Sequence, residues 1–297
     1  MINGIIVINK PQGFTSFDVV AIVRGCFHTK KVGHSGTLDP MANGVLPVFI
    51  GSATKAISIL PDHSKSYRAG FRLGVTSDTL DVWGNCTEEM DVLVSERLMR
   101  SVLEKFKGDI MQVPPMYSAL KVNGQKLCDL ARKGIEVERE PRPVTISKLE
   151  LSILQKTDGI IDIECSSGTY IRSLIDDIGK ELGCGAVMTS LLRTKACGFE
   201  FLDSVDIEKL KYYMTDEERA ALVRPVDSVF TEYPEIRLDS EQERLYLNGA
   251  RLDTARLDCD NGDIDDGKRY RVYGDKFIGI ADAVQGELIP VKRLMGD

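Results

Sequence analysis

The chain has 297 residues, of which 43% are hydrophobic and 28% are charged, a composition that excludes a disordered chain and, at roughly 150 residues per domain, predicts about two domains. No apolar run approaches the ~20 residues that span a bilayer and the N-terminus has no secretory signal, so we expect a cytoplasmic protein without membrane contact. The net charge of −7 argues against a uniformly basic surface, yet the first 72 residues carry eight Lys and Arg against three Asp and Glu, which favours a local anionic partner.

The N-terminal segment predicts a strand, a turn and a helix. Apolar residues over 4–9 indicate a strand, and the Lys-Pro-Gln-Gly sequence at 10–13 is typical of a turn. Thr15 and Asp18 have the spacing of a capping box, which predicts a helix over 17–27. The apolar face expected for this helix consists of Phe17, Val20, Ala21 and Val23.

Residues 29–44 form a glycine-rich loop with a single aspartate, Asp39, immediately before a proline. The proline pushes Asp39 towards an extended conformation, away from helix capping, although an ordinary turn aspartate is the alternative. Gly33 and Gly36 permit a close approach of the backbone to a ligand. The loop also offers a ring for stacking and two ammonium groups for phosphates, namely His34, Lys30 and Lys31.

The next elements follow in chain order. Strands are expected over 45–50, 66–74, 144–155, 160–166 and 192–201, and helices over 52–60, 95–106, 125–133, 169–182 and, as two short helices, 206–222. Tyr67 lies on the apolar face of its strand, where a core tyrosine is the ordinary outcome. Residues 113–143 form a long excursion bounded by prolines, and such insertions in compact domains are usually functional.

Arg172 is unexpected in its place. Thr169 or Gly168 opens the helix expected over 169–182, so Arg172 falls in the first turn, where a cation meets the positive end of the helix dipole. Two interpretations remain open. Arg172 either pairs on the surface with Asp176 at i+4 or reaches an anion elsewhere, such as Asp39.

Cofactor and metal motifs are weak in this sequence. Seven cysteines, none in a Cys-x-x-Cys pair, and three histidines do not favour a zinc site, and the cysteines are expected to be reduced. Residues 262–268 resemble a phosphate-binding loop, but Arg269 replaces its Ser or Thr and its acidic residues would repel phosphate. From about 235, acidic turns such as 258–266 alternate with short strands, which predicts a small β-rich domain.

Six motifs occur in a fixed order over the first 200 residues. They are Asn-Lys-Pro-Gln-Gly at 9–13, Gly-His-Ser-Gly-Thr-Leu-Asp-Pro at 33–40 with Ala-Asn-Gly-Val-Leu-Pro at 42–47, the alternating strand at 65–73, Pro-Pro-Met-Tyr-Ser-Ala-Leu-Lys at 114–121, Gly-Thr-Tyr-Ile-Arg at 168–172 and Leu-Leu-Arg at 191–193. In this order they closely resemble the motifs of bacterial tRNA pseudouridine-55 synthases, the TruB family.

The resemblance implies an isomerase that acts on uridine-55 in the T loop of tRNA without a metal or a cofactor. The target base is flipped out, its N-glycosidic bond breaks, the base turns, and C5 bonds to C1′. Asp39 matches the essential aspartate, as a nucleophile or as a base towards the ribose, and Arg172 matches the arginine that pairs with it. Tyr67 matches a tyrosine that stacks on the target base, and these three are the expected catalytic residues. Substrate binding is expected from Tyr67 together with His34, Tyr170 and Leu191.

The expected partner is the T arm and T loop of tRNA, bound by a monomer. The expected RNA contacts are Lys10, Lys30, Lys31, Lys121, Lys126, Arg132 and Arg193. The excursion at 113–143 looks like the family's thumb over the substrate, although an ordinary solvated helix is the alternative. Residues 203–297 carry a net charge of −8, so the C-terminal part is a weak candidate for phosphate contact and could instead stabilise or space the catalytic domain.

The fold implied is α+β and pseudouridine-synthase-like. We expect a catalytic domain over 1–232, with a mixed, largely antiparallel sheet and flanking helices, and a small PUA-like domain over 233–297. Two other functions stay open. A catalytically silent RNA-binding protein would not need a buried carboxylate facing phosphates, and a hydrolase of small nucleosides would need neither the basic N-terminal part nor the basic excursion.

Overall fold

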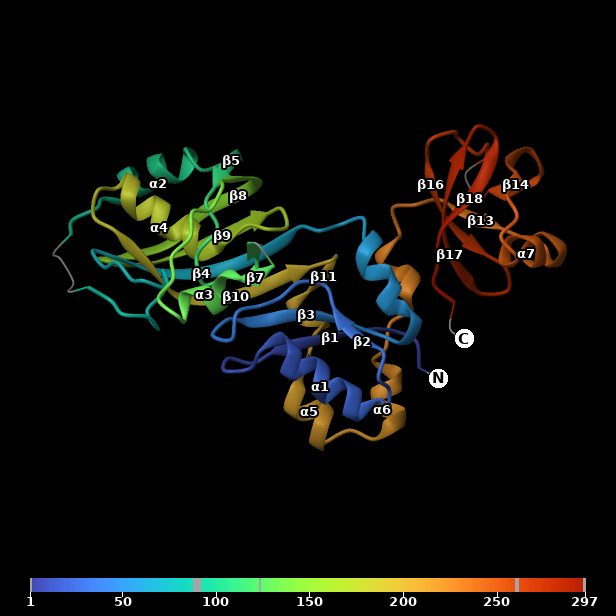
Figure 1. Ribbon diagram of the computed structural model, residues 1–297, viewed down its shortest axis with the longest axis horizontal. Helices are drawn as coiled ribbons and strands as arrows, with labels where there is room; N and C mark the ends of the chain where they lie inside the picture. Colours follow the sequence, from blue (N-terminus) through green and yellow to red (C-terminus); the bar gives the residue numbers. More distant parts are fainter. Residues whose placement is uncertain (1, 88–91, 123, 260–261, 296–297) are drawn as a thin grey trace. The chain divides into compact units, whose positions relative to one another are not determined.

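The computed structural model describes residues 2–87, 92–122, 124–259 and 262–295 (Figure 1). The chain divides into two compact units. The first contains Met1–Pro40, Val45–Asp62 and Cys197–Asp297, and the second contains Met41–Gly44 and His63–Ala196. Among the described residues, no helix has the length and apolar character needed to cross a membrane.

The first unit begins with a small mixed sheet and its helices. Strand β1 lies between β12, which is parallel to it, and β3, and β2 pairs antiparallel with β3. The elements are β1 (Gly4–Lys10), α1 (Ser16–Cys26), β2 (Val32–His34), β3 (Asn43–Ile50), η1 (Gly51–Ile59), β11 (Phe199–Glu200), η2 (Phe201–Asp203), β12 (Val205–Asp206), α5 (Ile207–Tyr212), α6 (Asp216–Ala221) and η3 (Val226–Val229). The helix expected over 52–60 is η1 (Gly51–Ile59), which adopts the tighter 3-10 form.

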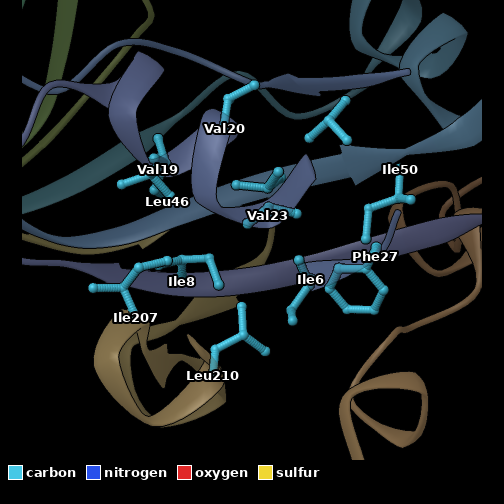
Figure 2. Close-up of a cluster of buried hydrophobic side chains, with 12 residues drawn as sticks. Ile6, Ile8, Val19, Val20, Val23, Phe27, Leu46, Ile50, Ile207 and Leu210 are labelled. Carbon is cyan, nitrogen blue, oxygen red and sulfur yellow. The ribbon is translucent and has the colours of Figure 1, made fainter. Parts of the chain in front are cut away.

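The core of this sheet is formed by α1, α5 and the strands they cover (Figure 2). The capping box is confirmed, because the Thr15 side chain accepts from the Asp18 amide. The expected apolar face of α1 is wrong at Phe17, which is 64% exposed, and at Ala21, which is exposed. The helix instead buries the i, i+3, i+4, i+7 row that starts one residue earlier, Ser16, Val19, Val20 and Val23.

The second unit contributes five strands that pair antiparallel in the order β10-β4-β9-β8-β5. Asn43 and Gly44, the first residues of β3, pair in parallel with Leu192 and Arg193 on β10, so the sheet is mixed and largely antiparallel, as predicted. Helices α2 and α4 lie on one face of it (Figure 1). The elements are β4 (Lys65–Leu73), α2 (Glu96–Glu104), β5 (Gly108–Gln112), β6 (Lys121–Val122), β7 (Gln125–Lys126), α3 (Leu127–Ala131), β8 (Arg142–Gln155), β9 (Asp158–Cys165), α4 (Ile171–Glu181) and β10 (Ala186–Ala196).

Helix α4 packs tightly against the sheet of the second unit. Its predicted ridge is confirmed, because Leu174, Ile175 and Ile178 are buried. A Cβ on Gly179 would lie 2.2 Å from the backbone nitrogen of Ala186, so the helix and β10 approach too closely for any side chain there. The helix begins after Tyr170, not at 168 or 169, and β10 begins at Ala186, not at 192.

The C-terminal part is β-rich, as predicted. It forms a separate six-stranded sheet, β14-β18-β17-β16-β13-β15, around a core that includes Tyr246, Tyr270 and Val272. Its elements are β13 (Glu235–Arg237), α7 (Ser240–Leu247), β14 (Leu252–Asp253), η4 (Thr254–Arg256), β15 (Asp258–Cys259), β16 (Arg269–Tyr273), β17 (Phe277–Val284) and β18 (Glu287–Arg293). In the expected acidic turn at 258–266, residues 260 and 261 lie outside the described residues, and the domain division at 232/233 stays a prediction.

Candidate active site

Asp39 stands in the loop between β2 and β3 on a backbone that is held from both sides. The residue before it, Leu38, exchanges two hydrogen bonds with the buried Ser16 hydroxyl, which accepts from the Leu38 amide at 2.9 Å and donates to its carbonyl at 3.2 Å. The carbonyl of the residue after it, Pro40, accepts from the Gly13 amide at 2.8 Å and from Lys10 Nζ at 3.2 Å. The half-buried Asp39 is therefore carried by an ordered segment within the first unit.

Lys10 has a different place from the one expected. Its side chain is fully buried, and its ammonium donates to the carbonyls of Pro11 at 2.9 Å, Phe14 at 2.7 Å and Pro40 at 3.2 Å. These converging carbonyls offset the cost of removing a cation from water. Lys10 therefore joins the turn at 10–14 to the Asp39 loop, and its expected contact with RNA stays a prediction.

The other residues singled out over 29–44 all precede Asp39, within β2 or next to it. Lys30 and Lys31 are exposed, and the half-buried His34 is the last residue of β2. The close approach expected at Gly33 is to the protein itself, because a Cβ there would lie 3.2 Å from the Ile57 side chain. Gly36 has a φ of 110°, a conformation that only glycine adopts without strain.

Arg172 is 6% exposed and lies in the first turn of α4. Its Nη1 donates to the Thr79 carbonyl at 2.9 Å, its Nη2 donates to the Tyr117 carbonyl at 2.8 Å, and Nη1 is 3.5 Å from Asp81 Oδ2. The surface pair with Asp176 is wrong, because Asp176 instead accepts from Lys180 at 2.6 Å. The guanidinium thus lies in a buried site with carbonyl and carboxylate oxygens around it.

Sequence reasoning missed Asp81, which faces Arg172. Its Oδ1 accepts from the Thr79 hydroxyl at 2.6 Å and from the Trp83 amide at 3.1 Å, which leaves Oδ2 directed at the guanidinium. The loop closes on itself, since the backbone and side-chain N–H groups of Asn85 bind Asp78 and lower the pKa of that carboxyl. The dense run of Ser, Asp, Thr and Gly over 76–84 is typical of such side-chain-to-backbone turns and could have drawn attention to it.

The remaining expected pocket residues lie in the second unit. Tyr67 is 8% exposed on β4, between Arg193 on β10 and Ile163 on β9. Tyr170 is half-buried at the start of α4, and Leu191 is 7% exposed on β10. Arg193 is fully buried between its neighbours on the sheet, and its expected contact with RNA stays a prediction.

The excursion at 113–143 contains a two-stranded ribbon, β6–β7, that the sequence did not predict, followed by the short helix α3. Lys121 and Lys126 are exposed and stand directly opposite each other in this ribbon. Like charges at such a position are destabilising, and an anion bound there would relieve the repulsion. Arg132 is also exposed, and its Nη1 lies 3.4 Å from Asp129 Oδ1.

The candidate residues fall into two groups. His34 and Asp39 lie in the first unit, whereas Tyr67 and Arg172 lie in the second, so the pairing of Asp39 with Arg172 stays a prediction. Among the described residues, no group of three or more His, Cys, Asp or Glu side chains has the geometry to hold a metal ion. The first unit thus offers a carboxylate on a loop whose flanking backbone is hydrogen-bonded, and the second unit offers a buried guanidinium and, on β4, a buried tyrosine.

Comparison with known proteins assigns this chain to a family. Residues 24–171 match the TruB family pseudouridylate synthase (N terminal domain), and residues 172–231 match the tRNA pseudouridylate synthase B C-terminal domain. A tRNA pseudouridine synthase B of Clostridium kluyveri is 43% identical over 281 residues, which cover 94% of this chain and 94% of that protein. The chain belongs to the TruB family of pseudouridylate synthases.

Further relatives of this TruB-family chain match it over nearly its whole length. The tRNA pseudouridine synthase B of Clostridium tetani is 41% identical over 99% of this chain and 100% of that protein, and that of Stutzerimonas stutzeri is 39% identical over 99% and 96%. A crystal structure of a Cbf5-Nop10-Gar1 complex contains a similar fold, with a TM-score of 0.75 and 25% identity over 99% of this chain and 85% of that chain. The expected fold class is confirmed.

Proposed function

We propose that this TruB-family chain isomerises uridine-55 in the T loop of tRNA to pseudouridine, with Asp39 as its essential carboxylate. Membership of the family and the names of its relatives support a pseudouridine synthase that acts on tRNA. The observation that carries the role of Asp39 is its backbone, which Ser16 and Lys10 hold on either side within the loop that the family motif matches. Such preorganisation is what a reacting group needs.

The isomerisation requires one bond to break and one to form at the same sugar carbon. The N1–C1′ bond of uridine breaks, the uracil turns, the C5–C1′ bond forms, the proton on C5 leaves, and N1 takes up a proton, so the product is an isomer of uridine. Asp39 either attacks covalently or removes a proton from the ribose, and the proposal leaves both routes open. Tyr67, which lies on the buried face of β4, stacks on the flipped base, and Arg172 keeps the carboxylate charged and oriented.

The proposed substrate surface is basic and uses exposed cations. Its members are Lys30, Lys31, Lys121, Lys126 and Arg132, and the proposed substrate-binding residues besides Tyr67 are His34, Tyr170 and Leu191. The opposed lysines of the β6–β7 ribbon support an anionic partner. The same proposal includes the T arm of tRNA as the partner, a monomeric enzyme, and a reaction without metal or cofactor. It also includes a cytoplasmic location, which the seven free cysteines support.

The test uses a tRNA transcript carrying tritium at C5 of uridine, because isomerisation releases that hydrogen to water. We expect about one equivalent of tritium per tRNA from the wild type and none from Asp39→Asn. A matched control, Asp275→Asn, changes an exposed carboxylate in a turn of the C-terminal sheet and is expected to react like the wild type. Binding of tRNA without tritium release by the wild type would favour the silent RNA-binding protein, and equal release by Asp39→Asn would remove Asp39 from the reaction.

A further inference from the structure

Gln112 is a buried polar residue that no step of the proposed reaction uses. It is the last residue of β5, it is 2% exposed, and the excursion at 113–143 begins immediately after it. Its side-chain amide faces the start of α4 and not the sheet, although its backbone remains paired with Arg142 on β8. A buried amide must be hydrogen-bonded to be tolerated, so its partners indicate its purpose.

The partners of Gln112 are both backbone groups of Tyr170. The Tyr170 amide donates to Gln112 Oε1 at 2.8 Å, and Gln112 Nε2 donates to the Tyr170 carbonyl at 3.0 Å. The Gln112 side chain thus makes with Tyr170 the pair of backbone hydrogen bonds that a neighbouring strand would make. Tyr170 is the N-cap of α4 and provides no side-chain cap of its own, so the beginning of this helix is held from outside by Gln112.

Two further hydrogen bonds join the same turn of α4 to the first residues of the excursion. Ser173 Oγ donates to the Val113 carbonyl at 3.2 Å, and Arg172 Nη2 donates to the Tyr117 carbonyl at 2.8 Å. The start of α4 and the start of the excursion are therefore one hydrogen-bonded assembly. Within this assembly, Gln112 is the side chain that both donates and accepts a hydrogen bond. It is therefore the best placed to set the direction of the helix.

We infer that Gln112 is a positioning residue for Arg172, and that it couples Arg172 to the RNA-binding excursion. This inference rests on the proposed function, since it assumes that Arg172 acts in the reaction. A helix start that shifts by about an ångström carries the guanidinium with it, and such a displacement of a reacting group can lower a rate by about 10²-fold. RNA that bends or lifts the excursion would act on α4 through the same four hydrogen bonds.

The experiment compares Gln112→Met, which has a similar length and neither hydrogen bond, with Gln112→Glu, which still accepts from the Tyr170 amide. The rate of tritium release in a single turnover at saturating tRNA is expected to fall at least about tenfold in Gln112→Met and by less in Gln112→Glu, while the Kd for tRNA stays within about twofold. Leu151→Ala, a buried change on β8, the strand that packs against α2, serves as a control that lowers the melting temperature without lowering this rate.

A second measurement does not depend on activity. Hydrogen exchange of a peptide spanning 166–174 should accelerate in Gln112→Met, because the Tyr170 amide loses its acceptor, and it should stay slow in Leu151→Ala. The inference would be overturned if this exchange were unchanged in Gln112→Met, or if Gln112→Met released tritium no more slowly than Leu151→Ala. It would also be overturned if saturating tRNA restored the tritium-release rate of Gln112→Met. A wild type without tritium release but with the expected exchange pattern would reject the proposed function and the role in catalysis, and retain only the structural coupling.

Discussion

Replacing Ser16 with alanine tests how the backbone beside Asp39 is held. Ser16 is 2% exposed, and its hydroxyl accepts from the Leu38 amide at 2.9 Å and donates to the Leu38 carbonyl at 3.2 Å. Alanine keeps the helix but leaves one donor and one acceptor of Leu38 without that partner. The perturbation therefore acts on the residue next to the proposed reactive carboxylate and leaves the carboxylate itself intact.

The magnitude follows from the two backbone groups. A buried polar group that loses its partner costs about 1–3 kcal/mol, so two such groups predict a loss of about 2–4 kcal/mol in the free energy of unfolding after partial hydration. The better helix propensity of alanine returns roughly 0.5 kcal/mol. Because the reorganised loop carries Asp39, the single-turnover rate should fall by about 10²-fold, whereas the Kd for tRNA should stay close to that of the wild type.

Urea unfolding and tritium release measure the two effects separately. Ser101→Ala is the matched control, because this exposed serine also lies in a helix and its hydroxyl donates only to Leu98 O, at 2.7 Å. Its free energy of unfolding should change by no more than about 0.5 kcal/mol, and its rate should not change. If Ser16→Ala unfolded and reacted like the wild type, the reasoning that Ser16 holds the Asp39 loop would be refuted.

Three further predictions concern charge and protonation. Asp81→Asn removes the carboxylate charge from the guanidinium it faces, so the single-turnover rate should fall by about tenfold with tRNA binding unchanged, and a wild-type rate would argue against that contact. The double change Lys121→Ala and Lys126→Ala should reduce the slope of log K against log salt for tRNA binding by about 1.5, and an unchanged slope would remove both lysines from the phosphate surface. Burial raises the pKa of Cys165 to about 11, so its thiolate becomes abundant only as pH approaches that value. Mass spectrometry should therefore find the exposed Cys86 alkylated first at neutral pH, and equal labelling would contradict the burial of Cys165.

The parts of the fold that the sequence predicted well are those in which one segment contains both interacting partners. The capping box of Thr15 and Asp18 depends on three-residue spacing, and the apolar ridge of α4 depends on the helical period. The sequence motifs were similarly sufficient for the family, because their order along the chain is a property of the sequence alone. The predicted start of β10 was wrong, at 192 and not at Ala186, because this boundary depends on pairing with β4.

The face that α1 buries shows where such local reasoning ends. Apolarity placed Phe17 in the core, but the helix turns Ser16 inward to bind Leu38, and Phe17 lies about 100° round the helix from it. The apolar pattern of the helix alone cannot predict that Ser16 is buried in place of Phe17, because the hydrogen-bonding groups of Leu38 are 22 residues away in the chain. The aromatic ring instead packs on the surface, 5.5 Å from the guanidinium of Arg24.

The sequence by itself determined the family, the candidate Asp39 and Arg172, the capped helix and the mixed character of the sheet. Only the tertiary structure decided that Lys10 is buried and that Asp81 and Gln112 support the start of α4. The physical reason is that each of these polar side chains is tolerated only where backbone or charged groups from distant segments converge on it. That convergence arises when the strands find their register and the helices pack, and no spacing along the chain records it.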